Sequence, residues 1–114
     1  MDGGDQFRLE GQFFDWHAWH DHEPPGPATL RVTGKCTFRT TGYGVKLRRS
    51  ELQENNPWPG NLLLELIVEA PPPGTHVGQG FTTLDVRYKE ETDVEYETVT
   101  ILSGSVTTRV EDVT

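Results

Sequence analysis

The chain has 114 residues, of which 33% are hydrophobic and 25% charged, and its formal net charge is −8. A chain of this length holds one core, so we expect a single domain over residues 1–114, with residues 1–6 as a flexible N-terminal tail. The negative charge argues against nucleic acid and anionic membrane surfaces as partners, because both would repel it.

The apolar content and the start of the chain predict a cytoplasmic protein with no membrane partner. The longest apolar run, residues 62–68, is interrupted by Glu65 and is too short to cross a bilayer. The first residues lack the basic and apolar stretches of a secretory signal. Cys36 is the single cysteine and lies in a strand-like run, so we expect a small buried side chain without a disulfide.

The N-terminal half of the chain shows the alternation that is typical of strands. Residues 7–21 predict one long strand or two short ones. Residues 30–38 alternate apolar and polar side chains with a period of two, which predicts a half-buried strand. Residues 43–48 repeat this pattern after a short link that contains a glycine, so we expect the two strands to pair as an antiparallel hairpin.

The C-terminal half predicts a further set of strands. Residues 62–68 are apolar on both faces, and the prolines on either side leave room for a strand but not for a typical helix. Residues 84–88 and 94–101 alternate on either side of an acidic turn, which predicts a second hairpin with a long loop. Ser103 and Gly104 then indicate a tight turn into a last strand over residues 106–110.

Six or seven strands without any window of helical periodicity indicate an all-β fold. An antiparallel sandwich of the immunoglobulin-like type fits the number and length of the strands. The Cys, Trp, Cys spacing of antibody domains is absent from the sequence, however. A small closed β-barrel is the alternative architecture.

The most unusual segment is residues 13–22, which contains four aromatic residues, three histidines and two aspartates. In an extended strand Trp16, Ala18, His20 and His22 share one face. His20 and His22 then stand about 6.6 Å apart along the strand, near enough for both imidazoles to bind one ion. This spacing raises the hypothesis of a site for a divalent transition metal such as zinc.

A metal site needs at least a third ligand, and the sequence offers several without diagnostic spacing. The candidates are His17, Glu23, the distant His76, or an acidic side chain from a paired strand. The alternative interpretation is that the histidines lie at the surface and contact only solvent. We favour that interpretation, because a His-x-His pair without an identified third ligand is a weak motif.

Three tryptophans are the other candidate functional residues. Trp58 lies between two prolines and could present a rigid aromatic side chain to a partner, but we expect it to fold back over the core. Trp16 and Trp19 flank the histidine segment. Either could pack into the core or contact a partner.

Three functions are compatible with these observations. The absence of a catalytic motif favours the first, a non-catalytic module that binds a protein partner or self-associates through Trp58, Trp16 or Trp19. The second is a metal-binding protein or small metalloenzyme that uses the His-x-His pair. The third is a carbohydrate-binding module in which Trp16, Trp19, Trp58 or Tyr43 stacks against a sugar ring.

Overall fold

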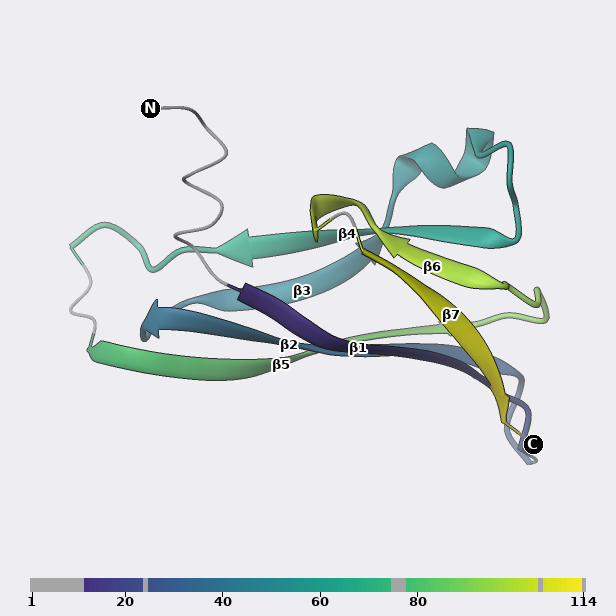
Figure 1. Ribbon diagram of the computed structural model, residues 1–114, viewed down its shortest axis with the longest axis horizontal. Helices are drawn as coiled ribbons and strands as arrows, with labels where there is room; N and C mark the ends of the chain where they lie inside the picture. Colours follow the sequence, from purple (N-terminus) through teal and green to yellow (C-terminus); the bar gives the residue numbers. More distant parts are fainter. Residues whose placement is uncertain (1–11, 24, 75–77, 105, 114) are drawn as a thin grey trace.

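A computed structural model describes residues 12–23, 25–74, 78–104 and 106–113 (Figure 1). It contains seven strands: β1 (Gln12–Asp21), β2 (Thr29–Thr40), β3 (Gly44–Arg49), β4 (Asn61–Glu69), β5 (Gln79–Glu91), β6 (Thr98–Ile101) and β7 (Val106–Val113). Two short 3₁₀ segments, η1 (Glu51–Asn55) and η2 (Leu102–Gly104), lie between strands. The expected N-terminal tail and the start of the first predicted strand lie outside the described residues.

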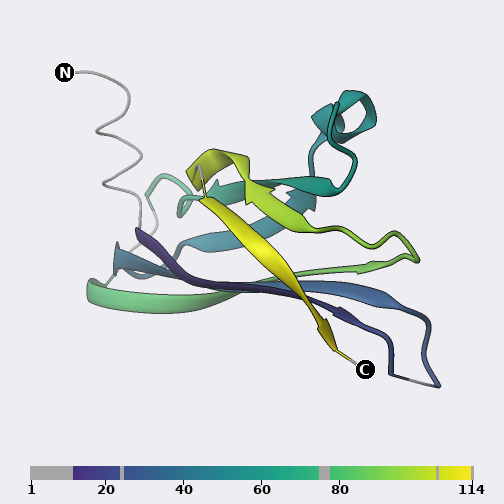
Figure 2. The ribbon, with the colours of Figure 1, turned by 45° about the vertical axis from the view of Figure 1, so that its right-hand side comes forward.

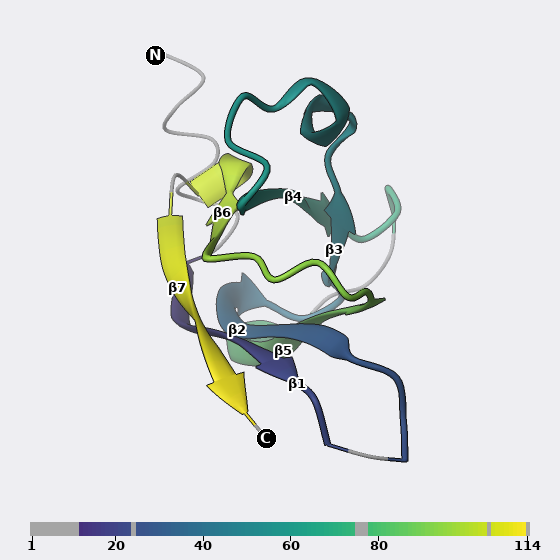
Figure 3. The same cartoon turned by 90° about the vertical axis from the view of Figure 1, so that its right-hand side faces the viewer.

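The seven strands form one sheet in the order β3-β4-β6-β7-β1-β2-β5. The sheet curls into a nearly closed barrel (Figures 1 and 3). β7 joins its two halves, of which one consists of β3, β4 and β6 and the other of β1, β2 and β5. Neighbouring strands are antiparallel except for the parallel pairs β4–β6 and β1–β7. The all-β prediction is therefore confirmed, and the arrangement supports the barrel alternative. Two separate sheets of an immunoglobulin-like sandwich are not seen, because β7 pairs with strands of both halves.

The predicted hairpin between residues 30–38 and 43–48 is wrong. β2 pairs with β1 on one side and with β5 on the other, whereas β3 pairs with β4. The link after β2 carries the chain to the opposite layer (Figure 2), and the rings of Phe38 and Tyr43 stack near this corner with centroids 4.4 Å apart. A short link with a glycine permits a hairpin but does not require one, since a chain can also leave the layer at that point.

The predicted hairpin between residues 84–88 and 94–101 is also wrong. β5 is an edge strand beside β2, and β6 pairs with β4 and β7. Residues 92–97 instead carry the chain across the end of the barrel (Figure 3). The turn after β6 is confirmed, since η2 connects it to an antiparallel β7.

The core lies inside the barrel and comes from the alternating apolar positions of the strands. In β2 every second residue from Leu30 to Phe38 is buried, as the period of two predicts. The same holds for Leu62, Leu64 and Leu66 in β4. Cys36 is fully buried, as expected, and burial raises the pKa of its thiol to about 12. Within the described residues no helix is long and apolar enough to cross a membrane.

The two edge strands of the sheet, β3 and β5, are connected through side chains. Arg49 of β3 places Nη1 3.0 Å from Glu90 Oε1 of β5 and 3.1 Å from the hydroxyl of Tyr96. Tyr88 and Tyr96 both donate hydrogen bonds to the Glu90 carboxylate, at 2.6 and 3.0 Å. Burial raises the pKa of both phenols, so they stay protonated and able to donate to a pH above their usual range.

Candidate metal centre

An irregularity in β1 precedes the histidine pair. The register of β1 against β2 shifts between Phe14 and His17, and Asp15 adopts a positive φ of 59°. This bulge leaves the Asp15 and His17 side chains exposed, where His17 Nε2 lies 3.0 Å from Asp15 Oδ1. After the bulge regular alternation resumes, and it turns Ala18 and His20 into the barrel.

His20 is held in the barrel wall by a backbone acceptor. His20 is only 2% exposed, and its Nε2 lies 3.0 Å from the carbonyl oxygen of Thr92. A carbonyl can only accept, so Nε2 must carry the hydrogen and a neutral ring keeps a free lone pair on Nδ1. A hydrogen bond from one ring nitrogen to a backbone carbonyl is the usual support for a histidine that ligates a metal through the other.

The third polar group of the cluster comes from the C-terminal strand. β1 and β7 run parallel, and their register places Asp112 opposite His20. The ring centroids of His20 and His22 are 4.4 Å apart, and Asp112 Oδ1 lies 2.9 Å from His22 Nε2. One possible ligand atom from each of the three residues lies within 4.8 Å of those of the other two.

One atom of this cluster lacks a hydrogen bond. His22 Nε2 is covered from solvent and forms no hydrogen bond of acceptable geometry with the described residues, even though Asp112 is close. Buried polar atoms in folded proteins almost always have a partner, which is sometimes an ion. An imidazole nitrogen without a hydrogen bond, beside a carboxylate and a second imidazole, is the arrangement that a bound metal ion would complete.

The other residues proposed from the sequence do not join this cluster. His17 faces the outer surface with Asp15, and the backbone of Glu23 binds the carboxylate of Asp21 at 3.0 Å. His76 lies outside the described residues. The structure thus brings His20 and His22 together, and it supplies the acidic side chain from a paired strand as Asp112, a residue that no local motif marks.

The cluster adjoins a cleft in the barrel wall. The ladder between β6 and β7 ends at the pair Thr98 and Arg109, and one more backbone hydrogen bond runs from Val110 N to Glu97 O at 2.9 Å. A cleft lies beside this end of the ladder, against residues 95–98 and 109–112. This cleft has a volume of about 530 Å³, and both His20 and Asp112 line it. A ligand in the cleft can therefore reach two of the three groups in the cluster.

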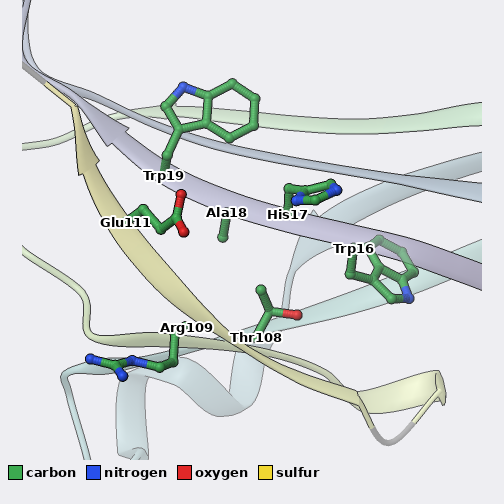
Figure 4. A pocket seen from close by; sticks show the side chains of 7 residues that line it. All are labelled: Trp16, His17, Ala18, Trp19, Thr108, Arg109 and Glu111. Atoms are coloured by element: carbon green, nitrogen blue, oxygen red, sulfur yellow. The ribbon is translucent and has the colours of Figure 1, made fainter.

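The tryptophans occupy three different settings. Trp16 and Trp19 lie on different sides of β1 and line a second cavity of about 460 Å³ between β1 and β7 (Figure 4). Trp58 is 73% exposed, so the expectation that it folds back over the core is wrong. Tyr43, stacked on Phe38, does not present both ring faces to a ligand. The four aromatic residues therefore do not form a single platform for a sugar.

The loop that carries Trp58, here called the braced loop (residues 52–60), is held by hydrogen bonds although its apolar side chains face solvent. The side chain of Gln53 is buried and its Oε1 accepts a 2.7 Å hydrogen bond from the backbone of Leu63. The backbone of Trp58 donates to Asn56 Oδ1 at 3.0 Å. Leu52 in the same loop is 62% exposed. These hydrogen bonds hold the backbone of the loop in the conformation that leaves Trp58 exposed.

Comparisons with protein-family models, with curated proteins and with solved structures find no match for this chain. Three features of the structure could therefore carry a function: the cluster, the cleft and the loop that carries Trp58. Of these, the cluster has the most specific chemistry, because it combines two imidazoles and one carboxylate around a common point.

Proposed function

We propose that this protein binds one divalent transition-metal ion, with zinc as the first candidate, through His20, His22 and Asp112. The observation that carries the proposal is the convergence of three ligand groups from two strands to within 4.8 Å. A tetrahedral shell with metal bonds of about 2.0–2.1 Å separates its ligand atoms by roughly 3.4 Å. The three groups have to come closer together to reach that spacing, and their places on paired positions of β1 and β7 keep them within reach of one another.

Two further observations support a metal and not a simple ion pair. His22 Nε2 is covered and lacks a hydrogen bond, so a metal would satisfy it. The Thr92 carbonyl holds the hydrogen of His20 on Nε2 and leaves Nδ1 as the ligating atom. Two neutral imidazoles and one carboxylate are a donor set that both zinc and iron(II) accept in proteins.

The test is a zinc titration of the chelator-treated full chain, followed by calorimetry and by metal analysis after dialysis. We expect one zinc ion per chain. The variants His20→Ala, His22→Ala and Asp112→Asn should each weaken binding by at least tenfold. His17→Ala is the matched control, because this histidine lies on the outer surface of the same strand. Equal affinity in Asp112→Asn and His17→Ala would refute the proposal.

A second candidate function is a protein contact through the braced loop, because Leu52 and Trp58 stay exposed on a rigid scaffold. Preorganised aromatic side chains bind with a small loss of conformational entropy. Self-association is the simplest form of this contact. Sedimentation of the wild-type chain and of Trp58→Ser over a range of concentrations tests it: the wild type should associate and the variant should remain monomeric. Identical monomeric behaviour would count against it.

A further inference from the structure

We propose that the metal at His20, His22 and Asp112 keeps a coordination position open to the adjoining cleft. A small organic carboxylate binds in that position, with Arg109 as its second anchor. The inference rests on the proposed function, since it requires the metal. It adds the chemical class of ligand and the residue that selects it.

The number of ligands is the first argument for an open position. Structural zinc sites have four protein ligands, whereas sites that bind substrate have three and leave a position free. Among the described residues only His20, His22 and Asp112 converge. Glu95 is the nearest further carboxylate, with Oε1 4.0 Å from His22 Nε2, but its side chain is 75% exposed and it does not join the group.

The cleft gives the open position an access route. It is bounded by the end of β7 and by residues 95–98, and its lining includes His20 and Asp112. Its volume of about 530 Å³ falls within the range of small-molecule sites. Glu97 and Thr98 are still joined to β7, so a ligand in the cleft approaches the metal from beside Glu95 and the end of β7, where His20 and Asp112 line the cleft.

Arg109 supplies the argument for the class of ligand. It lines the cleft, and its guanidinium forms no hydrogen bond or ion pair with any residue that the structure describes. Arg109 also lines the second cavity between β1 and β7, which Figure 4 draws, and there its side chain lies on the side of β7 away from β1. A guanidinium binds a carboxylate through two parallel hydrogen bonds, and a metal binds the same group directly.

The charge of the rim limits the size and charge of the ligand. Glu95, Glu97 and Glu111 line the same cleft and repel polyanions such as nucleotides. The metal and Arg109 attract a single negative charge. A monocarboxylate of a few carbon atoms satisfies both conditions, because its charge lies at the metal and its apolar part lies toward the rim.

The experiment uses the full chain loaded with cobalt(II), whose visible spectrum reports the number and geometry of its ligands. Butanoate is added, and imidazole serves as a neutral donor in a parallel titration. We expect saturable spectral changes with both. Arg109→Gln should weaken butanoate binding about tenfold and leave imidazole binding unchanged. Arg87→Gln is the matched control, because Arg87 is an exposed arginine on β5, away from the cleft.

The outcomes separate this inference from the proposed function. If cobalt binds with one-to-one stoichiometry but neither probe changes the spectrum, the shell is closed and the inference fails while the metal site remains. If imidazole binds and butanoate does not, or if Arg109→Gln has no effect, the assignment of a carboxylate ligand is overturned. If cobalt does not bind to the three-residue cluster, the proposed function itself fails.

Discussion

Trp16 and Gly34 show how single residues define the interior of the barrel. Trp16 lies inside, against the backbone of Gly34 on the neighbouring strand, and a Cβ atom at position 34 would overlap the indole ring. The glycine is therefore required for close approach and not for a turn. Its position in the apolar alternation of β2 marks an inward-facing site that a neighbouring aromatic side chain fills.

Gly34→Ala should destabilise the protein by about 1–3 kcal/mol, because the indole or the strand must move to admit the methyl group. Gly26→Ala is the control, since nothing lies within 4 Å of a Cβ there, and it should leave stability within about 0.5 kcal/mol. Urea unfolding followed by tryptophan fluorescence measures both. Equal stability of the two variants would show that Trp16 does not pack as described.

Cys36 makes the free energy of unfolding depend on pH in the alkaline range. Burial raises its pKa to about 12 in the folded protein, whereas an unfolded thiol ionises near 8.5. The contribution of the thiol to the free energy of unfolding is fully present below the pKa of the unfolded thiol. It is lost as the pH rises toward 12, and the free energy of unfolding then falls by up to about 1.4 kcal/mol per pH unit. Tyr88 and Tyr96 act in the same direction, because burial raises their pKa values too.

Cys36→Ala isolates the thiol from the two phenols. The free energy of unfolding of the wild type should fall more steeply between pH 9 and about 10.5 than that of the variant, because only the wild type can ionise a thiol on unfolding. A thiol reagent should also react with folded wild-type protein far more slowly than with urea-unfolded protein. Parallel pH profiles for the two proteins would contradict this account.

At the level of elements, the hydrogen bonds between β3 and β5 are the notable feature of the barrel. The sheet has two edges, and the Arg49 guanidinium joins them through Glu90 and Tyr96. Glu90 has only 17% of its side chain exposed, so loss of its partner leaves a poorly solvated carboxylate. Covering an edge in this way also limits pairing with other chains.

Arg49→Met should lower the free energy of unfolding by about 1–2 kcal/mol and speed hydrogen exchange in β3 and β5. Arg48→Met is the control: Arg48 pairs with Glu65 on the adjacent strand at 3.0 Å, and because 64% of its side chain is exposed, its loss should lower the free energy of unfolding less than Arg49→Met does. An equal loss in both variants would mean that Arg49 does not close the barrel.

For the whole molecule, the proposed metal site lies where distant parts of the chain meet. His20 and His22 belong to β1, Asp112 belongs to β7, and Thr92 belongs to the connection between β5 and β6. The parallel ladder between β1 and β7 extends over only four residue pairs. A metal at this junction would therefore link the two halves of the barrel.

Zinc should accordingly stabilise the folded chain, by about 2.7 kcal/mol when its free concentration is one hundred times the dissociation constant. Thermal unfolding in increasing zinc measures the effect as a rise in Tm. Asp112→Asn should reduce the rise sharply, and His17→Ala should preserve it. The proposal would be in difficulty if both variants responded like the wild type.

The sequence by itself determined the properties that depend on neighbouring residues. The period of two in residues 30–38 predicts which side chains of β2 are buried, because successive side chains of any strand point to opposite faces. The same local rule placed His20 and His22 on one face. It also led to the count of six or seven strands, since each strand has its own pattern and its own boundaries.

Only the tertiary structure decided which strands are partners and what surrounds the histidines. Both predicted hairpins are wrong, because alternation reports the exposure of a strand and not the identity of its neighbour. Asp112 joins the cluster through a parallel pairing of the first and last strands, which no local signal encodes. Trp58 is exposed in a loop whose backbone N–H groups donate to the side-chain oxygens of Gln53 and Asn56. The pairing of β1 with β7, in contrast, joins distant parts of the chain and forms only when the whole sheet curls up.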